Sequence, residues 1–295
     1  MSSETVLNLA AGRLRLDLSP SIGGAISGFE WVDGDGSRPI LRECHRPLEK
    51  VLDAPNFPLV PYVNRIRNGR FTFRDREVRI APNMAGDPSP LHGQGWLNPW
   101  QVDRAGERHA SLSFQHQPGE WPWAYEARQH FVLDDHSLNL TLTCHNTDDE
   151  PMPCGLGQHP YFPCGPATRL DSKVTHAWTI DEKVLPVEKV PAEGRYDLQN
   201  RLICGQDLDN GFSGWSGEAR MSDPQWPYEV RLTSPDSHFF QVYSPSAGGI
   251  FVAEPVTHAN AALNAPEEQW AELGMRVLEP GEEMSLAMRL EVIPK

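Results

Sequence analysis

SLNLTLTCHN, residues 137–146, places Leu138, Leu140 and Leu142 at every second position, with polar residues between them. Successive side chains point to opposite faces of a β-strand, so this pattern predicts a strand with one buried face. Similar alternation recurs along the chain, in residues 5–9, 13–18, 69–73, 111–116, 229–234, 239–244 and 284–293. The segment is therefore one of many, and together they predict an all-β protein.

Clusters of turn-forming residues separate these segments, as in residues 33–37, 82–90 and 244–249. Helical periodicity is weak, and residues 265–273 are expected to form no more than two short turns. Many short strands with few short helices favour a large antiparallel β-sandwich. Because similar strands lie near both ends and no linker-like stretch divides the chain, residues 1–295 are expected to form a single domain.

The composition excludes several classes of function. A formal net charge of −14 repels phosphate backbones and anionic membrane surfaces, so no nucleic-acid or membrane partner is expected. No stretch approaches the roughly 18 consecutive apolar residues of a membrane span. The five cysteines are widely spaced and predict reduced thiols rather than a disulfide framework. With no leader-like N-terminus, a soluble cytoplasmic protein is expected.

Several catalytic motifs are missing from the sequence. It has no glycine-rich nucleotide or dinucleotide motif, no G-x-S-x-G nucleophile motif and no H-E-x-x-H or H-x-H metal motif. Chemistry that needs only side-chain acids and bases is therefore favoured, with no cofactor and no metal site.

Two polar segments interrupt the alternation in the first third of the chain. In NFPLVPYVNRIRNGRF (56–71), Arg65 lies between Asn64 and Ile66 and is interpreted as a buried guanidinium that can bind two oxygens at once. Arg67 and Arg70 fit either a binding site or a solvated surface. In SPLHGQGWLNPW (89–100), glycines next to His92 permit close approach of the backbone to a ligand, and Trp96 offers a flat apolar surface suited to a sugar ring.

Two further segments supply a histidine and a carboxylate, each framed by Gly or Pro. GLGQHPYFP (155–163) contains His159, and GGIFVAEPVTHANAALN (248–264) has Glu254 at the end of an apolar run. Burial of the Glu254 carboxyl predicts a raised pKa, which makes it a better base than an exposed carboxylate. The two residues together indicate acid/base chemistry, whereas either alone would more often be structural.

Five motifs in this order, PYVNRIRNGRF, LHGQGW, GQHPYF, DLDNGF (207–212) and EPVTHANAALN, resemble the aldose 1-epimerase (galactose mutarotase-like) family. The stretch RLRLDLSPSIGGAISGFEW (13–31) is similar to the opening strands of that family. The resemblance covers nearly the whole chain, discontinuously. It implies a large β-sandwich that binds a monosaccharide in a cleft on one sheet.

The resemblance also implies roles for individual residues. His159 and Glu254 match the catalytic histidine and glutamate of the family. The substrate-binding positions match Asn64, Arg65, His92 and Asp209, with Asp207 as a competitor for the last. Two departures, Gln94 in HGQGW and EPVTH in place of an E-T-Q type of sequence, put the recognition of individual hydroxyls in doubt.

A mutarotase opens a cyclic hemiacetal, rotates the freed carbonyl and closes the ring on its other face. The hypothesis assigns Glu254 as the base for the C1 hydroxyl and protonated His159 as the acid for the ring oxygen, with Trp96 lining the pocket. Three alternatives stay open: a non-catalytic sugar-binding β-sandwich, a mutarotase for an anionic sugar held by the arginines, and a glycoside hydrolase that uses Asp209 and Glu254. A monomer or a homodimer is expected.

Overall fold

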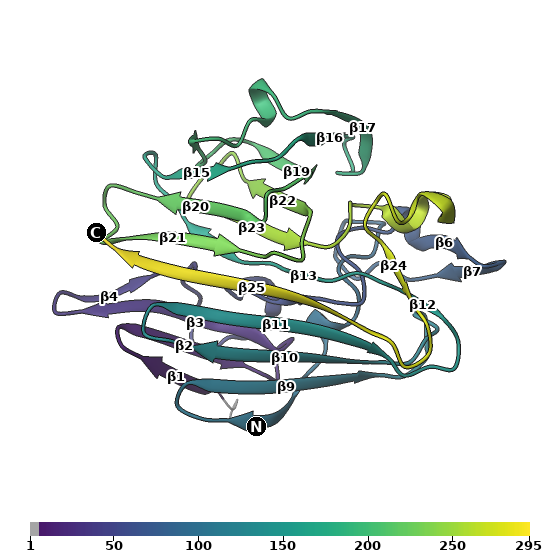
Figure 1. The fold of residues 1–295 in the computed structure, drawn as a ribbon, viewed down its shortest axis with the longest axis horizontal. Coiled ribbons are helices and arrows are strands. Elements are labelled where there is room, and N and C mark those ends of the chain that lie inside the picture. Colours follow the sequence, from purple (N-terminus) through teal and green to yellow (C-terminus); the bar gives the residue numbers. More distant parts are fainter. Residues whose placement is uncertain (1–5) are drawn as a thin grey trace.

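Antiparallel strands are the main regular elements of the computed structural model, which describes residues 6–295 (Figure 1). The largest sheet has nine strands, in the order β18 (Arg201–Leu202), β15 (Arg169–Ser172), β20 (Glu218–Ser222), β21 (Tyr228–Thr233), β25 (Glu283–Pro294), β11 (Ser137–Asn146), β10 (Tyr125–Leu133), β9 (His109–His116) and β8 (Gln101–Ala105). Figure 1 shows the long strand β25 lying between β21 and β11, so the last strand of the chain is the central strand of this sheet.

A second sheet has eight strands and carries the residues of interest. Its order is β17 (Pro186–Pro191), β16 (His176–Ile180), β19 (Leu208–Ser213), β22 (Phe239–Ser244), β23 (Ile250–Val256), β13 (Gly157–Gln158) and β5 (Pro58–Leu59), and β14 (Tyr161–Pro163) also pairs with β23. The central strand β23 therefore contacts β22 along one edge and the segment around residue 159 along the other.

Smaller sheets and short 3₁₀ turns complete the fold. One small sheet has four strands, in the order β1 (Leu7–Ala11), β2 (Leu14–Ser19), β3 (Ala25–Asp33) and β4 (Gly36–Pro39). Two more have two strands each: β6 (Arg70–Phe73) pairs with β7 (Arg76–Arg79), and β12 (Met152–Cys154) pairs with β24 (Arg276–Leu278). The 3₁₀ turns are η1 (Val51–Asp53), η2 (Arg67–Gly69), η3 (Gly95–Leu97), η4 (Gly194–Tyr196), η5 (Ala262–Asn264) and η6 (Glu267–Gln269). No helix in residues 6–295 is long and apolar enough to cross a membrane.

The alternating sequence accounts for the packing between the two large sheets. In β11 the side chains of Leu138, Leu140 and Leu142 are buried, while the residues between them are partly exposed. They join one hydrophobic cluster with Phe240 and Phe251, which come from the eight-stranded sheet. Full burial of a side chain of this size contributes about 1.5–3 kcal/mol. The predicted antiparallel β-sandwich is confirmed.

Most sequence-predicted strands coincide with observed ones. Segments 137–146 and 239–244 match β11 and β22 at both ends, and segment 284–293 lies within β25. The segment predicted for residues 5–9 begins at a residue outside the described range, and its remainder overlaps β1. Residues 265–273 form η6 followed by turns, as expected from their weak periodicity.

Candidate active site

The register of three strands places three polar side chains on the face of the eight-stranded sheet that points away from the central core. Gln241 on β22 lies directly opposite Glu254 on β23 and Gly211 on β19. Asp209, two residues before Gly211, faces the same way. Gln241 donates a hydrogen bond from Nε2 to Asp209 Oδ1 at 2.9 Å, so the three side chains form one polar row.

The predicted catalytic residues are in direct contact. His159 lies between β13 and β14, and its backbone N–H donates to Phe57 O at 3.1 Å. Its Nε2 atom is 3.3 Å from Glu254 Oε1. Glu254 is 2% exposed and His159 is 9% exposed. His159 Nδ1 and Glu254 Oε2 are buried without a hydrogen-bond partner among the described residues, which typically costs about 1–3 kcal/mol per group.

Burial disfavours charge on both members of this pair. Desolvation raises the pKa of Glu254 well above its usual range; the nearby Asp209 carboxylate raises it further, and Arg65 opposes the rise. Desolvation also lowers the pKa of His159 to about 3, with the Arg42 cation adding to the effect. The raised pKa of Glu254 agrees with the sequence prediction. For His159 the lowered pKa runs against the protonated form that the sequence hypothesis assigns to the acid.

Aromatic rings hold the imidazole of His159. Phe57 stacks on it with ring centroids 4.6 Å apart, and Tyr161 lies 4.7 Å away at a tilt. His92 meets it edge-on at 5.4 Å. Phe57, Tyr161 and His92 thus form an aromatic wall around the imidazole, and Phe162, the next residue after Tyr161, is not part of it. Phe162 instead points to the core, where it stacks on Phe251, because neighbouring residues of β14 face opposite sides of the sheet.

The loop before β6 supplies the predicted arginine. Arg65 donates from Nε to Asp87 Oδ2 at 2.8 Å and from Nη1 to Asn64 Oδ1 at 3.1 Å, so its guanidinium is oriented on two sides. The Asn64 backbone N–H donates to His92 Nδ1 at 3.1 Å, which leaves the proton of the neutral imidazole on Nε2. Burial lowers the pKa of His92, and the neighbouring His159 and Arg65 groups add to the effect.

Asn64 and His92 also share an unusual backbone conformation. Their φ angles are 60° and 62°, in the left-handed region that residues other than glycine seldom adopt. Such conformations cost about 1–3 kcal/mol and persist where the surrounding structure enforces them, often at functional sites. Here the two residues are tied to each other by the hydrogen bond from Asn64 to His92.

The motif EPVTHANAALN holds this loop in place. Three of its side chains accept hydrogen bonds from alternate backbone N–H groups of the loop: His258 from Val63 at 2.9 Å, Asn260 from Arg65 at 3.1 Å and Asn264 from Arg67 at 2.7 Å. Gly155 makes room for His258, since a Cβ at this position would lie 2.0 Å from the imidazole Cδ2. The motif thus joins the strand that bears Glu254 to the loop that bears Arg65.

The structure distinguishes the two candidate aspartates. Asp209 is half-buried on β19, where burial raises its pKa and Arg65 opposes the rise. Asp207 is exposed immediately before β19 with φ of 53°, and its backbone oxygen accepts a hydrogen bond from Arg195. Of the two, Asp209 is the one that lies with Gln241 and Glu254.

The expectation that Trp96 lines the pocket is corrected. Trp96 is 1% exposed and stacks on Phe57, with centroids 5.4 Å apart, while His92 meets it edge-on at 5.9 Å. Its indole N–H donates to the backbone oxygens of Leu91 and Gly93. Because both its ring and its N–H are occupied by protein, Trp96 supports His92 and Phe57 from behind.

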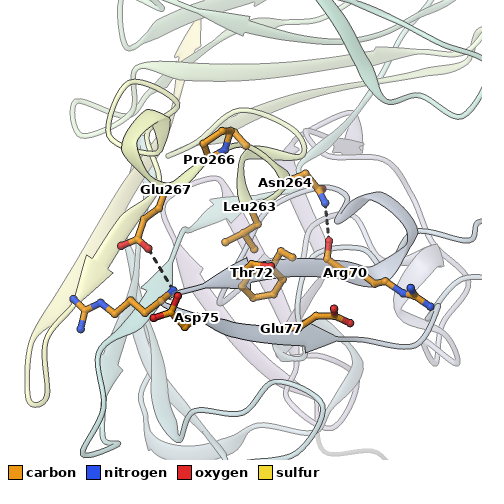
Figure 2. Close-up of a pocket in the computed structure, with 11 residues that line it drawn as sticks. Arg70, Thr72, Asp75, Glu77, Leu263, Asn264, Pro266 and Glu267 are labelled. Carbon is orange, nitrogen blue, oxygen red and sulfur yellow. Dashed lines mark hydrogen bonds between the residues drawn. The ribbon is translucent and has the colours of Figure 1, made fainter.

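The three arginines of the 56–71 segment do not converge. Arg67 is exposed and borders a hollow with Asp181 and Lys183. Arg70 borders a separate pocket of about 580 Å³ between the β6–β7 hairpin and residues 263–267, in which Asn264 Nδ2 donates to the Arg70 backbone oxygen at 2.7 Å (Figure 2). Only Arg65 lies with the predicted site residues.

Sequence reasoning missed Gln241, Phe57 and Arg42 as members of the site. Gln241 had a local signal, a polar residue among aromatic ones in a predicted strand, but Phe57 and Arg42 reach His159 and Tyr161 only through tertiary contacts. Among residues 6–295, no three His, Cys, Asp or Glu side chains are grouped so as to hold a metal ion.

Comparison with known proteins identifies a family and relatives over nearly the whole chain. The family model described as Aldose 1-epimerase matches residues 7–291. The uncharacterized protein YphB of Escherichia coli K12 is 35% identical over 302 residues, which cover 98% of this chain and 99% of YphB.

Two solved structures have the same fold. A crystal structure from Escherichia coli K12 with a provisional aldose 1-epimerase name has a TM-score of 0.90 at 33% identity, and the match covers 99% of this chain and 100% of that chain. A galactose mutarotase-like protein from Clostridium acetobutylicum has a TM-score of 0.87 at 18% identity and covers 100% of this chain and 96% of its own. The predicted galactose mutarotase-like sandwich is therefore confirmed.

Proposed function

The chain belongs to the aldose 1-epimerase family, and from this premise we propose that it interconverts the α and β anomers of an aldose at the pair His159 and Glu254. The contact of 3.3 Å between His159 Nε2 and Glu254 Oε1 carries the proposal. The C1 hydroxyl oxygen and the ring oxygen of an aldose are bonded to the same carbon, so an acid and a base that serve both must lie side by side. A buried pair in contact meets this requirement.

Ring opening moves one proton onto Glu254 and one proton off His159, so the pair carries one proton before and after the step. Glu254 as the base removes the proton of the C1 hydroxyl, and His159 as the acid gives a proton to the ring oxygen, so the C1–O5 bond breaks and the aldehyde forms. The pair then holds its proton on Glu254 instead of His159. That is the neutral form favoured by burial in the empty site. Ring closure on the opposite face returns the proton to His159.

Starting the reaction requires the carboxylate form of Glu254. Arg65 favours that form, since its positive charge lowers the pKa of Glu254 against the effect of burial. We assign Arg65, Asn64 and His92 to the sugar oxygens near the reacting centre, where a fixed cation and an N–H donor stabilise developing negative charge. We assign Asp209, oriented by Gln241, to hydroxyl groups farther along the sugar, for which a carboxylate is an acceptor.

The placement of the arginines favours a neutral aldose over an anionic one. An anion site built from the 56–71 segment would need at least two of its arginines to point to one place. Arg65 is already paired with Asp87 at 2.8 Å, and Arg67 and Arg70 border different hollows. We also infer a single domain, because one hydrophobic cluster includes residues from Leu9 to Val292.

Exchange NMR on equilibrated glucose and galactose tests the proposal, because it measures the rate of anomer interconversion directly. We expect the protein to increase this rate over buffer, and to do so more for the neutral sugars than for their 6-phosphates. Binding of a sugar without faster exchange would support the alternative of a non-catalytic sugar-binding protein. Faster exchange of the 6-phosphates alone would support an anionic substrate.

A further inference from the structure

Arg42 lies behind the aromatic wall of the site and contacts it closely. The centre of its guanidinium is 3.5 Å from the centroid of the Tyr161 ring, and its backbone N–H donates to the Tyr161 backbone oxygen at 2.8 Å. The Tyr161 ring in turn lies 4.7 Å from the imidazole of His159. A series of contacts, from guanidinium to phenol ring to imidazole, therefore links Arg42 to the proposed acid.

The guanidinium of Arg42 is fixed in this position by backbone oxygens. Its Nε and Nη2 atoms donate to the oxygen of Ala54 at 3.2 and 2.8 Å, and Nη2 also donates to the oxygen of Leu52. No carboxylate of residues 6–295 forms a salt bridge with it. Carbonyl oxygens orient a guanidinium without cancelling its charge, so Arg42 presents a fixed positive charge to Tyr161.

The other groups that face His159 do not supply such a charge. They are Glu254 from β23, His92 from the loop before η3 and Tyr161 from β14, and burial favours the neutral form of each. Arg65 acts one step away, beside His92 and Glu254. Among the groups around the imidazole, Arg42 is the cation whose charge opposes protonation of His159 and strengthens it as an acid.

We propose that Arg42 is a positioning residue for His159: fixed by the backbone oxygen of Ala54 and packed on Tyr161, it holds the imidazole against Glu254 and directs a positive charge toward it. The catalytic part of this inference rests on the proposed function. The action of Arg42 on His159 does not, because it can be measured without a sugar.

Arg42→Gln and Arg42→Lys test this inference, with Arg13→Gln as the matched control. Arg13 also lies over an aromatic ring, 5.2 Å from the centroid of Trp31, but outside the site. The ionisation of His159 is followed by NMR of ¹³C-labelled histidine, from neutral pH down to the onset of acid unfolding. A His159→Gln sample identifies the His159 signal. Anomer exchange is measured on the same proteins.

Arg42→Gln is expected to move the titration of His159 upward by about 1 pH unit, the order of effect of one nearby charge. It should also lower kcat, with KM within about twofold, because Tyr161 loses the guanidinium that holds it against the imidazole; the weaker acidity of His159 is offset by its larger protonated fraction. Arg42→Lys keeps the charge but loses the fork onto Ala54, so its titration should lie between those of Arg42→Gln and the unchanged protein.

An unchanged His159 titration in Arg42→Gln, or an equal shift in Arg13→Gln, would overturn the inference. If the titration shifts as expected but the unchanged protein does not accelerate anomer exchange, the action of Arg42 on His159 stands and the proposed function fails. The two failures are therefore distinguishable.

Discussion

The two faces of strands β22 and β23 bury different kinds of side chain. On one face, Phe240 and Phe251 pack into the core between the large sheets. On the other, Gln241 and Glu254 lie opposite each other in a polar row, and Glu254 is as inaccessible as many core residues. The same alternation produces both faces, since neighbouring residues of a strand point in opposite directions.

The two faces therefore contribute to stability with opposite sign. Burial of apolar side chains on the core face is favourable. Burial of Glu254 and His159, each with one polar atom lacking a partner among the described residues, is unfavourable. If the polar face is the site of chemistry, substitutions there should change rate more than stability, and substitutions on the core face should do the reverse.

Glu254→Gln is expected to have the largest effect. It keeps the shape of the side chain but removes the proposed base, so anomer exchange should slow by about 10²–10⁴-fold. The melting temperature should not fall, because a buried ionisable group is lost. Exposed Glu283 on β25 provides the control, and Glu283→Gln should leave both quantities unchanged. Full activity in Glu254→Gln would remove the basis for treating this face as catalytic.

Phe251→Ala, three residues away on the same strand, should behave in the opposite way. Phe251 is fully buried and stacks on Phe162 with centroids 5.3 Å apart, so the variant should lose about 3–5 kcal/mol of unfolding free energy in a urea titration. The kcat of the folded fraction should stay within a few-fold. If the variant does not fold, Phe251→Leu gives a smaller loss of the same kind. A large fall in kcat with little loss of stability would contradict the comparison.

Asp209→Asn tests whether the Asp209 end of the polar row contacts the substrate. Loss of the charged acceptor should weaken transition-state binding by about 1.5–3 kcal/mol, a decrease in kcat/KM of roughly 10–100-fold. Asp207→Asn, at the exposed position two residues earlier, should leave kcat/KM unchanged. Equal losses in both variants would indicate a general effect of charge and not a contact made by Asp209.

The pH dependence of stability offers a further test of the buried polar face. Because burial lowers the pKa of folded His159 to about 3 from an ordinary value of 6.5, the unfolded state binds the proton first. The stabilisation is present above pH 6.5 and is lost as the pH falls toward 3, with a slope of at most about 1.4 kcal/mol per pH unit for one group. His159→Gln should lose less stability over this range in urea titrations. Parallel pH profiles for the two proteins would contradict the neutral imidazole.

The sequence predicted the sandwich from local patterns, and local patterns together with the family resemblance named most of the polar residues that the fold brings together. Alternation identified β11, β22 and β25, and the residues next to Gly and Pro included His159 and Glu254. The pattern could not show that Trp96 is buried behind the site, because its ring is covered by Phe57, which lies in another loop. It also gave no sign that burial lowers the pKa of His159, since the degree of burial is set by neighbours from several strands.

Arg42 is the clearest example of what sequence could not provide. Nothing in its own segment distinguishes it from the exposed arginines nearby. Its role arises from contacts with Tyr161 and Ala54, which the fold brings together. The motif EPVTHANAALN was predicted in part. Its resemblance to the family is visible in the sequence, but only the structure shows that three of its side chains accept hydrogen bonds from the loop that bears Arg65.

A double-mutant cycle on anomer exchange tests the central claim, that His159 and Glu254 act as one proton-exchanging unit. The rates of Glu254→Gln, His159→Gln and the double variant are compared with that of the unchanged protein, after circular dichroism has shown that all four are folded. We expect the double variant to be about as slow as the slower single variant, because residues that act as a unit show strongly non-additive effects. Losses that multiply in the double variant would mean that the two groups act independently, and would contradict the account.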